Sequence, residues 1–230
     1  MSQLATDEVH LWVRRTADTE PAADWALLSE AEQARAQRFH FDVHRRDYVA
    51  SHALLRRALS SCGAGEPQRL EFWANAYGRP ELAGHNPRQL RFNLSRTRGV
   101  TVCAVARERE LGVDVEDLDR PGETLSVCET YFAASEVAAL RALPEAKQRA
   151  RFFDYWTLKE AYLKARGVGL SLPLDQFAFT LGEPIRIEVD PRLNDDASTW
   201  GFWQVRPSAR ELIALCVRRP PEQPLRLTLR

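Results

Sequence analysis

Several features that assign a chain to a specialised class of protein are missing from this sequence. The four cysteines, at positions 62, 103, 128 and 216, lie far apart and form no CxxC pair, so neither a zinc knuckle nor a disulfide framework is suggested. No stretch approaches about 18 consecutive apolar residues, and the N-terminus has no basic segment followed by an apolar run. We therefore expect a reduced, cytoplasmic protein that neither spans a membrane nor carries a secretory leader.

A net charge of one sign is also missing. The 32 basic and 32 acidic side chains cancel, so no overall field favours nucleic acid or an anionic membrane as a partner. Any site for an anion must therefore be built locally, from clustered side chains.

The 230 residues, 44% of them apolar, suffice for a full hydrophobic core. Ser29 followed by Glu32 forms a capping-box pattern, which predicts a helix that ends at about Arg38. A second helix is expected over 43–59, with an apolar stripe of leucine and alanine and with its arginines, Arg56 among them, on the solvent side. Further helices are expected over about 125–143 and 147–166.

Period-two alternation and β-branched residues predict strands between and after these helices. The expected strands cover residues 9–13, 70–73, 91–94, 100–106, 111–115, 177–181, 185–189, 200–205 and 212–217. Helices thus accompany strands in each half, which predicts an α+β fold of two similar lobes, residues 1–110 and 111–230. No repeat at the level of single residues supports this division.

An acidic strand motif begins the second half, at residues 112–116. Because side chains alternate along a strand, Asp114 and Glu116 share one face, while Val113 and Val115 enter the core on the other. The two carboxylates then lie roughly 7 Å apart, close enough to reach one cation. Taken alone, the motif is better explained as the solvated face of a half-buried strand.

A second motif lies in the helix expected over 147–166. At about 100° per residue, Trp156, Glu160 and Lys164 share one face of this helix. Taken alone, Glu160 and Lys164 would be an ordinary surface pair, worth roughly 0.3 kcal/mol.

The two motifs together make a stronger case than either one alone. Three carboxylates gathered in one cleft, from Asp114, Glu116 and Glu160, would repel one another unless a divalent cation neutralised them. Ligation by oxygen alone points to Mg²⁺, and the neighbouring Lys164 suits a phosphorylated substrate. The residues therefore predict metal-assisted chemistry on a phosphate.

These motifs resemble those of the Sfp-type 4′-phosphopantetheinyl transferase family, GxDxE followed by WxxKExxxK. Residues 112–116 and 156–164 match both patterns at every defined position. The resemblance continues upstream at residues 78–80 and 92–95, which are similar to the family's GKP and FNxSH elements. It runs in order from about residue 30 to residue 180.

The resemblance implies a 4′-phosphopantetheinyl transferase fold, with two α/β lobes in a pseudo-twofold arrangement. It also implies the activity, in which a serine of an apo acyl or peptidyl carrier protein receives the 4′-phosphopantetheine group of coenzyme A and adenosine 3′,5′-bisphosphate is released. The N-terminal lobe would face the 3′-phosphate and adenine, and the C-terminal lobe would carry the metal ligands and the catalytic helix. Mg²⁺ is the implied cofactor, and a monomer is expected.

Carried over by position, the resemblance gives a role to each matching residue. Asp114, Glu116 and Glu160 become the Mg²⁺ ligands, with Glu160, or a water that it orients, as the base. Lys164 would hold the pyrophosphate or assist the departing phosphate. Glu136 falls where the family often has a further active-site acid.

A second group of residues is implied to bind coenzyme A. Its members are Arg35, Arg79, Pro80, Asn93, Ser95 and Arg96. Arg79 stands where the family usually has lysine and Arg96 where it has histidine, but both replacements stay cationic and can bind a phosphate in a bidentate way. Because arginine does not titrate at physiological pH, Arg96 is not expected to transfer a proton.

Two other functions stay open at this point. The same carboxylates could direct a water molecule, as in a metal-dependent phosphohydrolase or nuclease. The arginine-rich stretch from Arg35 to Arg57 could bind nucleic acid, although the neutral total charge and the lack of a reading motif weigh against this function.

Overall fold

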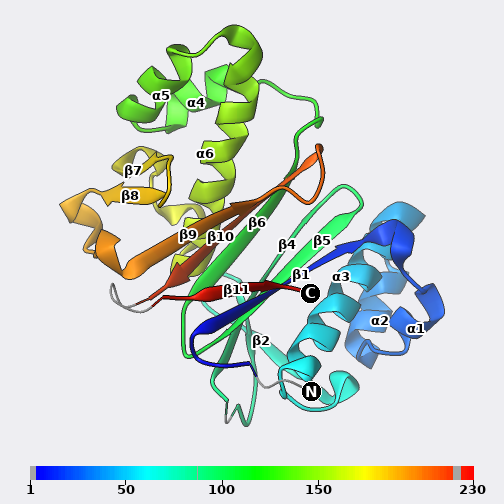
Figure 1. Ribbon diagram of the computed structural model, residues 1–230. Coiled ribbons are helices and arrows are strands. Elements are labelled where there is room, and N and C mark those ends of the chain that lie inside the picture. Colours follow the sequence, from blue (N-terminus) through cyan, green and yellow to red (C-terminus); the bar gives the residue numbers. More distant parts are fainter. Residues whose placement is uncertain (1–3, 87, 220–223) are drawn as a thin grey trace. The chain divides into compact units, whose positions relative to one another are not determined.

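A computed structural model describes residues 4–86, 88–219 and 224–230 of the chain. The chain divides into two compact units, one made of residues 1–111 with 224–230 and the other of residues 112–223. Each unit combines helices with β-sheet (Figure 1), so the predicted α+β class is confirmed. Within the described residues, no helix combines the length and the hydropathy that a membrane crossing requires.

The first unit is built on a four-stranded sheet with the order β11-β1-β5-β4. Its strands are β1 (Glu8–Arg15), β4 (Leu90–Thr97), β5 (Val100–Arg107) and β11 (Arg226–Leu229). β1, β5 and β4 are antiparallel neighbours, whereas β11 runs parallel to β1. A separate hairpin is formed by β2 (Phe72–Ala74) and β3 (Pro80–Leu82).

Three helices belong to this unit: α1 (Pro21–Trp25), α2 (Glu30–Gln37) and α3 (Asp42–Ser61). α2 begins with the predicted capping box, because the Ser29 hydroxyl accepts a hydrogen bond from the Glu32 amide while the Glu32 carboxylate accepts one from the Ser29 amide.

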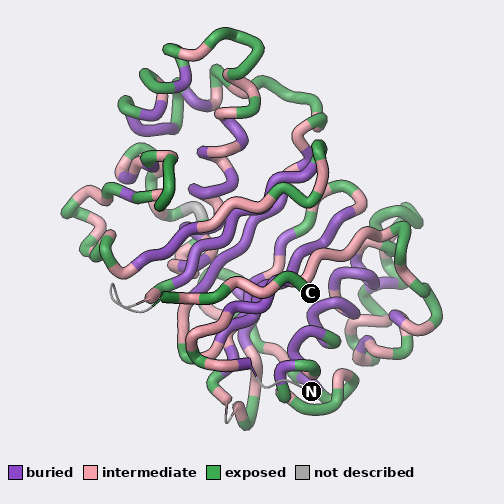
Figure 2. The backbone as a smooth tube through the Cα atoms, viewed as in Figure 1, coloured by how far each residue is buried: buried purple, intermediate pink, exposed green. Residues whose placement is uncertain are grey.

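The core of the first unit lies between α3 and the sheet. Leu54 and Leu55 of α3 are buried in one cluster with Phe92 of β4 and Val105 of β5. Figure 2 shows the same zone as a continuous buried segment along β5 and the inward side of α3.

Arg56 of α3 does not lie on the solvent side, so this prediction was wrong. The residue is 1% exposed. Its Nε lies 2.8 Å from the Glu32 carboxylate, and its Nη1 donates hydrogen bonds to the carbonyls of Pro67 and Leu70. A guanidinium can be buried where its donors meet acceptors in this way.

The second unit contains a three-stranded sheet with the order β6-β10-β9 and a hairpin of β7 with β8. The bounds are β6 (Leu111–Asp117), β7 (Phe177–Thr180), β8 (Arg186–Val189), β9 (Trp200–Val205) and β10 (Glu211–Arg218). β9 and β10 are antiparallel, as are β7 and β8.

Helix α6 (Glu145–Arg166) is the central element of the second unit, and α4 (Leu125–Tyr131) and α5 (Ala134–Arg141) lie at its N-terminal end (Figure 1). Leu158 and Tyr162 on its apolar face are buried in one cluster with Leu212 of β10. The helix ends at Gly167, whose φ of 66° lies in the left-handed region that favours glycine.

Several elements differ from the sequence prediction. The helix expected over 125–143 is two helices, because the backbone turns extended at Phe132 between α4 and α5. α1 and β3 are too short for a periodic signal, and the same holds for the 3₁₀ helices Thr16–Asp18, Pro67–Arg69, Gly169–Ser171, Leu174–Gln176, Pro191–Leu193 and Ala197–Thr199.

The end of the chain also differs from the predicted lobe of residues 111–230. β11 pairs with β1, so residues 224–230 return to the first unit. Pairing along β1 satisfies backbone groups that an open sheet edge would leave to solvent.

Candidate active site

Gly112 allows strand β6 to lie directly against helix α6. A β-carbon at this position would lie 2.1 Å from the carbonyl oxygen of Ala161 and 2.3 Å from the amide nitrogen of Ala165. Both separations are far below van der Waals contact, so no residue with a side chain fits. The first position of GxDxE therefore sets the separation between a strand with two acids and a helix with a third.

Asp114 and Glu116 of β6 both reach α6. The Nζ atom of Lys164 lies 2.6 Å from Oδ1 of Asp114, and Nε1 of Trp156 donates a hydrogen bond of 2.9 Å to Oε1 of Glu116. Val113 is fully buried, as strand alternation predicts for the opposite face. Two side chains of α6, two turns apart, thus hold two acids that are two residues apart on β6.

Glu160 lies between Trp156 and Lys164 on the same face of α6, one turn from each. Its half-buried carboxylate makes no hydrogen bond or ion pair within the described part of the chain. Burial raises the pKa of Glu160, the charge of Asp114 raises it further, and the charge of Lys164 lowers it. The carboxylates of Asp114 and Glu160 are therefore close enough to repel each other.

The carboxyl group of Glu116 is also shifted toward its protonated form. Burial raises its pKa to about 7, and the charge of Asp114 adds to the effect, while Arg120, the hydrogen bond from Trp156 and Lys164 oppose it. The Nε atom of Arg120 lies 2.9 Å from Oε2 of Glu116. Excess negative charge in a partly buried site is typical of positions that receive a cation or exchange a proton.

The predicted metal ligands lie in one region, but their side chains are not arranged around a common point as metal ligands would be. Across residues 4–86, 88–219 and 224–230, no three side chains of Asp, Glu, His or Cys are arranged to hold a metal ion. Instead, Lys164 pairs with Asp114 and Arg120 pairs with Glu116. The donor set itself, carboxylate oxygens in which the charge of Asp114 helps raise the pKa of Glu116 and Glu160, is chemically suited to a hard divalent cation.

Glu136, predicted as a further active-site acid, has a different environment. It is 1% exposed, and Lys159 Nζ lies 2.7 Å from its Oε2. Its two oxygens also accept hydrogen bonds from the amides of Ala133 and Phe179. With every oxygen engaged inside the core, Glu136 ties α5 and β7 to α6, so a direct contact with substrate does not fit this position.

Lys159 belongs to the WxxKExxxK motif, but the sequence analysis predicted no role for it. Besides Glu136, it donates hydrogen bonds of 2.7 Å to the carbonyls of Leu174 and Phe177, and it lies 4.4 Å from the centre of the Phe177 ring. Its spacing of four from Tyr155 and three from Tyr162 places it on the apolar face of α6, a signal that could have predicted its burial.

In the first unit, Arg35 and Arg96 both lie close enough to Tyr48 for their charges to act on its phenol. Burial raises the pKa of Tyr48, and both arginines act on the same phenol to lower it. The Arg35 guanidinium lies 5.7 Å from the centre of the Tyr48 ring, and the Tyr48 and His52 ring centres lie 3.9 Å apart at a tilt of 30°. Two cations beside a polar aromatic group could hold a phosphate.

The other predicted coenzyme residues lie elsewhere in the first unit. Asn93 and Ser95 are each 7% exposed, and strand alternation places them on the face of β4 opposite to Arg96. Pro80 is exposed at the start of β3, and Arg79 Nε lies 3.3 Å from the carboxylate of Glu81. The six residues therefore do not form a single patch on one face of β4.

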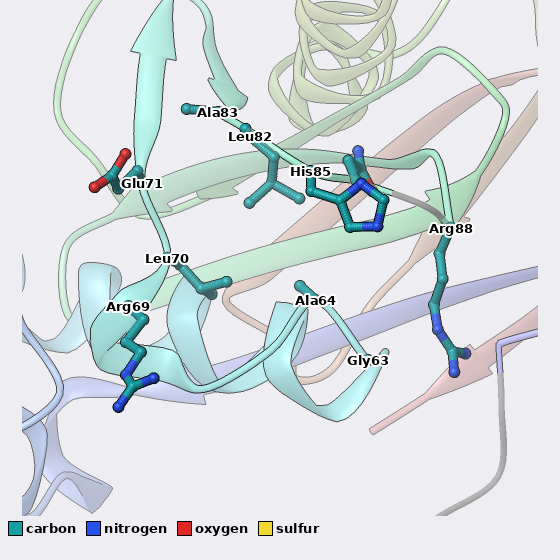
Figure 3. Close-up of a pocket in the computed structure, with 11 residues that line it drawn as sticks. Gly63, Ala64, Arg69, Leu70, Glu71, Leu82, Ala83, His85 and Arg88 are labelled. Atoms are coloured by element: carbon teal, nitrogen blue, oxygen red, sulfur yellow. The ribbon is translucent and has the colours of Figure 1, made fainter.

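A separate pocket in the first unit contains none of these residues. It lies beyond the C-terminal end of α3, between Gly63, Leu70 and Leu82, with Arg69, His85 and Arg88 at its rim (Figure 3). This pocket is thus distinct from the predicted coenzyme residues, whereas another hollow of the same unit is lined by Arg35, Arg38 and Phe39.

Comparison with known proteins assigns both units to one family. Residues 110–216 match the profile of the 4′-phosphopantetheinyl transferase superfamily, and residues 12–108 match that of "4′-phosphopantetheinyl transferase, N-terminal". The chain is 34% identical over 220 residues to the 4′-phosphopantetheinyl transferase HetI of Nostoc sp., an alignment that covers 93% of this chain and 89% of HetI.

A more distant curated relative carries the same description. The 4′-phosphopantetheinyl transferase Sfp of Bacillus subtilis is 24% identical over 197 residues, with 85% of this chain and 84% of Sfp covered. The solved structure of holo-(acyl-carrier-protein) synthase from Thermotoga maritima covers 48% of this chain and 62% of its own, with 21% identity and a TM-score of 0.40. From the matches over both units and the similarity to HetI, the chain belongs to the 4′-phosphopantetheinyl transferase superfamily, and the predicted resemblance to its Sfp-type members is confirmed.

Proposed function

We propose that this chain transfers the 4′-phosphopantetheine group of coenzyme A to a serine of an apo acyl or peptidyl carrier protein. The serine hydroxyl attacks the β-phosphorus, the bond to the bridging oxygen breaks, and adenosine 3′,5′-bisphosphate leaves. The observation that supports this reaction most directly is the group of three carboxylates with Lys164, which Gly112 brings together by its contact with α6.

Glu160 is the proposed base. Its carboxylate has no protein partner within the described residues, and burial together with the charge of Asp114 raises its pKa above the ordinary value of a glutamate. A base of raised pKa accepts a proton readily at physiological pH. The proton of the carrier serine would therefore pass to Glu160, directly or through one water molecule.

Asp114, Glu116 and Glu160 are the proposed ligands of Mg²⁺. When bound, the ion supplies positive charge to the pyrophosphate oxygens. Lys164 pairs with Asp114 in this structure, and its positive charge would stabilise the negative charge of the departing phosphate. Trp156 and Arg120 each bind one oxygen of Glu116 and so fix the direction of that ligand.

Coenzyme A is the proposed donor, and the first unit the proposed site for its nucleotide end. Arg35 and Arg96 offer two guanidinium groups for the 3′-phosphate. Asn93 and Ser95, on the other face of β4, would contact a different part of the nucleotide, together with Arg79 and Pro80 of the β2–β3 hairpin.

The two alternative functions have weaker support. Three of the six arginines in the Arg35–Arg57 stretch pair with acids of the same unit: Arg45 with Asp42, Arg56 with Glu32 and Arg57 with Asp24. These pairs offset part of the positive charge that nucleic acid would contact. A phosphohydrolase would use the same carboxylates, and the family relationship does not favour it.

Intact-protein mass spectrometry tests the proposal. The chain is incubated with coenzyme A, Mg²⁺ and a panel of apo acyl and peptidyl carriers, and each modified carrier is expected to gain about 340 Da, the mass of phosphopantetheine. A carrier whose acceptor serine is replaced by alanine should gain nothing. Hydrolysis of coenzyme A with no gain on any carrier would favour a phosphohydrolase instead. The cytoplasmic location and the monomeric state stay predictions.

A further inference from the structure

Arg120 lies beside the proposed metal ligands in a fixed position. Its Nε atom is 2.9 Å from Oε2 of Glu116, and its guanidinium lies 5.3 Å from the centre of the Phe153 ring. The side chain is nevertheless 41% exposed. Arg120 is therefore held on one side and open to solvent on another.

The backbone of Arg120 is fixed as well. Arg149 of α6 donates hydrogen bonds to the carbonyls of Leu118, at 3.3 Å, of Arg120, and of Gly122, at 3.1 Å. The amide of Arg120 donates a further hydrogen bond of 3.0 Å to the carbonyl of Asp117. The loop after β6 is thus attached to α6, so Arg120 loses little conformational freedom when it binds a ligand.

In the described part of the chain, the Nη donors of Arg120 are unused, and its Nε meets Glu116 as an ion pair rather than through an aligned hydrogen bond. Arginine offers five N–H groups, and the two Nη groups of Arg120 donate no hydrogen bond within the described residues. The second cation of this region, Lys164, is paired with Asp114. An anion that reaches the three carboxylates would therefore meet Arg120 as the cation with unused donors.

We propose that Arg120 contacts the pyrophosphate of coenzyme A, with its Nε side held by Glu116 and its Nη groups directed to a phosphate oxygen. The inference rests on the proposed function and assigns to it a substrate-binding residue outside both sequence motifs. Phosphate is favoured over a carboxylate of the carrier, because Arg120 is attached to a residue of the reacting cluster rather than to the outer surface.

Steady-state kinetics at saturating Mg²⁺ tests the contact. Arg120→Ala should raise the KM for coenzyme A about tenfold, and Arg120→Lys, which keeps the charge and loses the fork, should raise it less. Calorimetry should show the same loss in affinity for coenzyme A. Arg210→Ala is the matched control, because Arg210 pairs with Asp117 and Asp119 at the same end of β6 without touching Glu116.

The outcomes separate this inference from its alternatives. An unchanged KM for coenzyme A in Arg120→Ala, with a higher Mg²⁺ requirement, would reduce Arg120 to a residue that only positions Glu116. A raised KM for the carrier alone would assign Arg120 to carrier binding, and either result overturns the proposal. If the unmodified chain transfers no phosphopantetheine, the proposed function fails before Arg120 is tested.

Discussion

Two neighbouring residues of helix α6, Lys159 and Glu160, belong to two different clusters of acidic and basic side chains. The two clusters differ in their balance of charge. In the sealed cluster, Lys159 and Glu136 form one pair, and each is 1% exposed in its side chain. In the open cluster, half-buried Glu160 and Glu116 join buried Asp114, and within the described residues Lys164 pairs with Asp114 and Arg120 with Glu116.

The difference shows how one helix separates stability from chemistry. The sealed pair is neutral in sum and its hydrogen-bonding groups are engaged, so it holds α5 and β7 in place and has no capacity for a ligand. In the open cluster, burial raises the pKa of Glu116 and of Glu160, and the charge of Asp114 raises both further. A cation or a proton relieves that repulsion, and both are what phosphate transfer needs.

The largest effect on stability is expected at the sealed cluster. Lys159→Met leaves the Glu136 carboxylate buried without its cation and should lower the free energy of unfolding by about 4 kcal/mol. The double variant Lys159→Met/Glu136→Gln should recover much of this loss. Urea unfolding measures both, with Lys147→Met, an exposed lysine of α6, as the control. If the Lys159→Met variant is fully folded but transfers no phosphopantetheine, the sealed cluster also serves the reaction, and the assignment of separate roles to the two clusters is wrong.

Gly112→Ala tests the contact that brings β6 to α6. The added methyl group would collide with the backbone of Ala161 and Ala165, so we expect a loss of about 3 kcal/mol in the free energy of unfolding, together with a lower transfer rate. Gly182→Ala is the matched control, because its nearest atom would lie 3.9 Å away. Equal stability of the two variants would show that β6 and α6 are not packed as described.

In the absence of Mg²⁺, the open cluster should make the stability of the protein depend on pH in a way that the sealed cluster does not. The pKa of Glu116 is about 7 in the folded protein, above its ordinary value of 4.5. Its stabilising effect is therefore complete below about pH 4.5 and is lost as the pH rises through about 7. Glu116→Gln should exceed the parent protein in stability by about 2 kcal/mol at pH 8 and match it at pH 4.5.

Unfolding curves of the parent and Glu116→Gln at both pH values measure this difference. Added Mg²⁺ should restore stability to the parent and not to the variant. A gap between the two proteins that is independent of pH would contradict the raised pKa of Glu116.

The smallest effect is expected at Trp156. Trp156→Phe removes the hydrogen bond to Glu116 and keeps an aromatic ring beside Phe152, so the transfer rate should fall about fivefold, equivalent to about 1 kcal/mol. Rates measured with one carrier at saturating coenzyme A check this value. A loss of several hundredfold would mean that Trp156 does more than orient Glu116.

Much of the second unit could be predicted from the sequence, because its signals are local. Alternation on β6 and the 3.6-residue period of α6 correctly place Val113 in the core and Glu160 beside Lys164. The family motifs then identify the activity. None of this required knowledge of contacts between distant segments.

The features that sequence reasoning missed depend on such contacts. The burial of Arg56 depends on carbonyls in and after the 3₁₀ helix Pro67–Arg69, and the pairing of Lys159 with Glu136 depends on how α5 meets α6. The parallel pairing of β11 with β1 joins residues at opposite ends of the chain. No local pattern reports these partners, because each is chosen by the tertiary fold.

The central claim is that the open cluster carries the transfer reaction, and Glu160→Gln tests it most directly. Mass spectrometry of an apo carrier after incubation with coenzyme A and Mg²⁺ should show a rate about a thousandfold or more below that of the parent, while circular dichroism shows an intact fold. Glu145→Gln, an exposed acid on the same helix, should modify the carrier normally. Near-normal modification by Glu160→Gln would contradict the assignment of the reaction to this cluster.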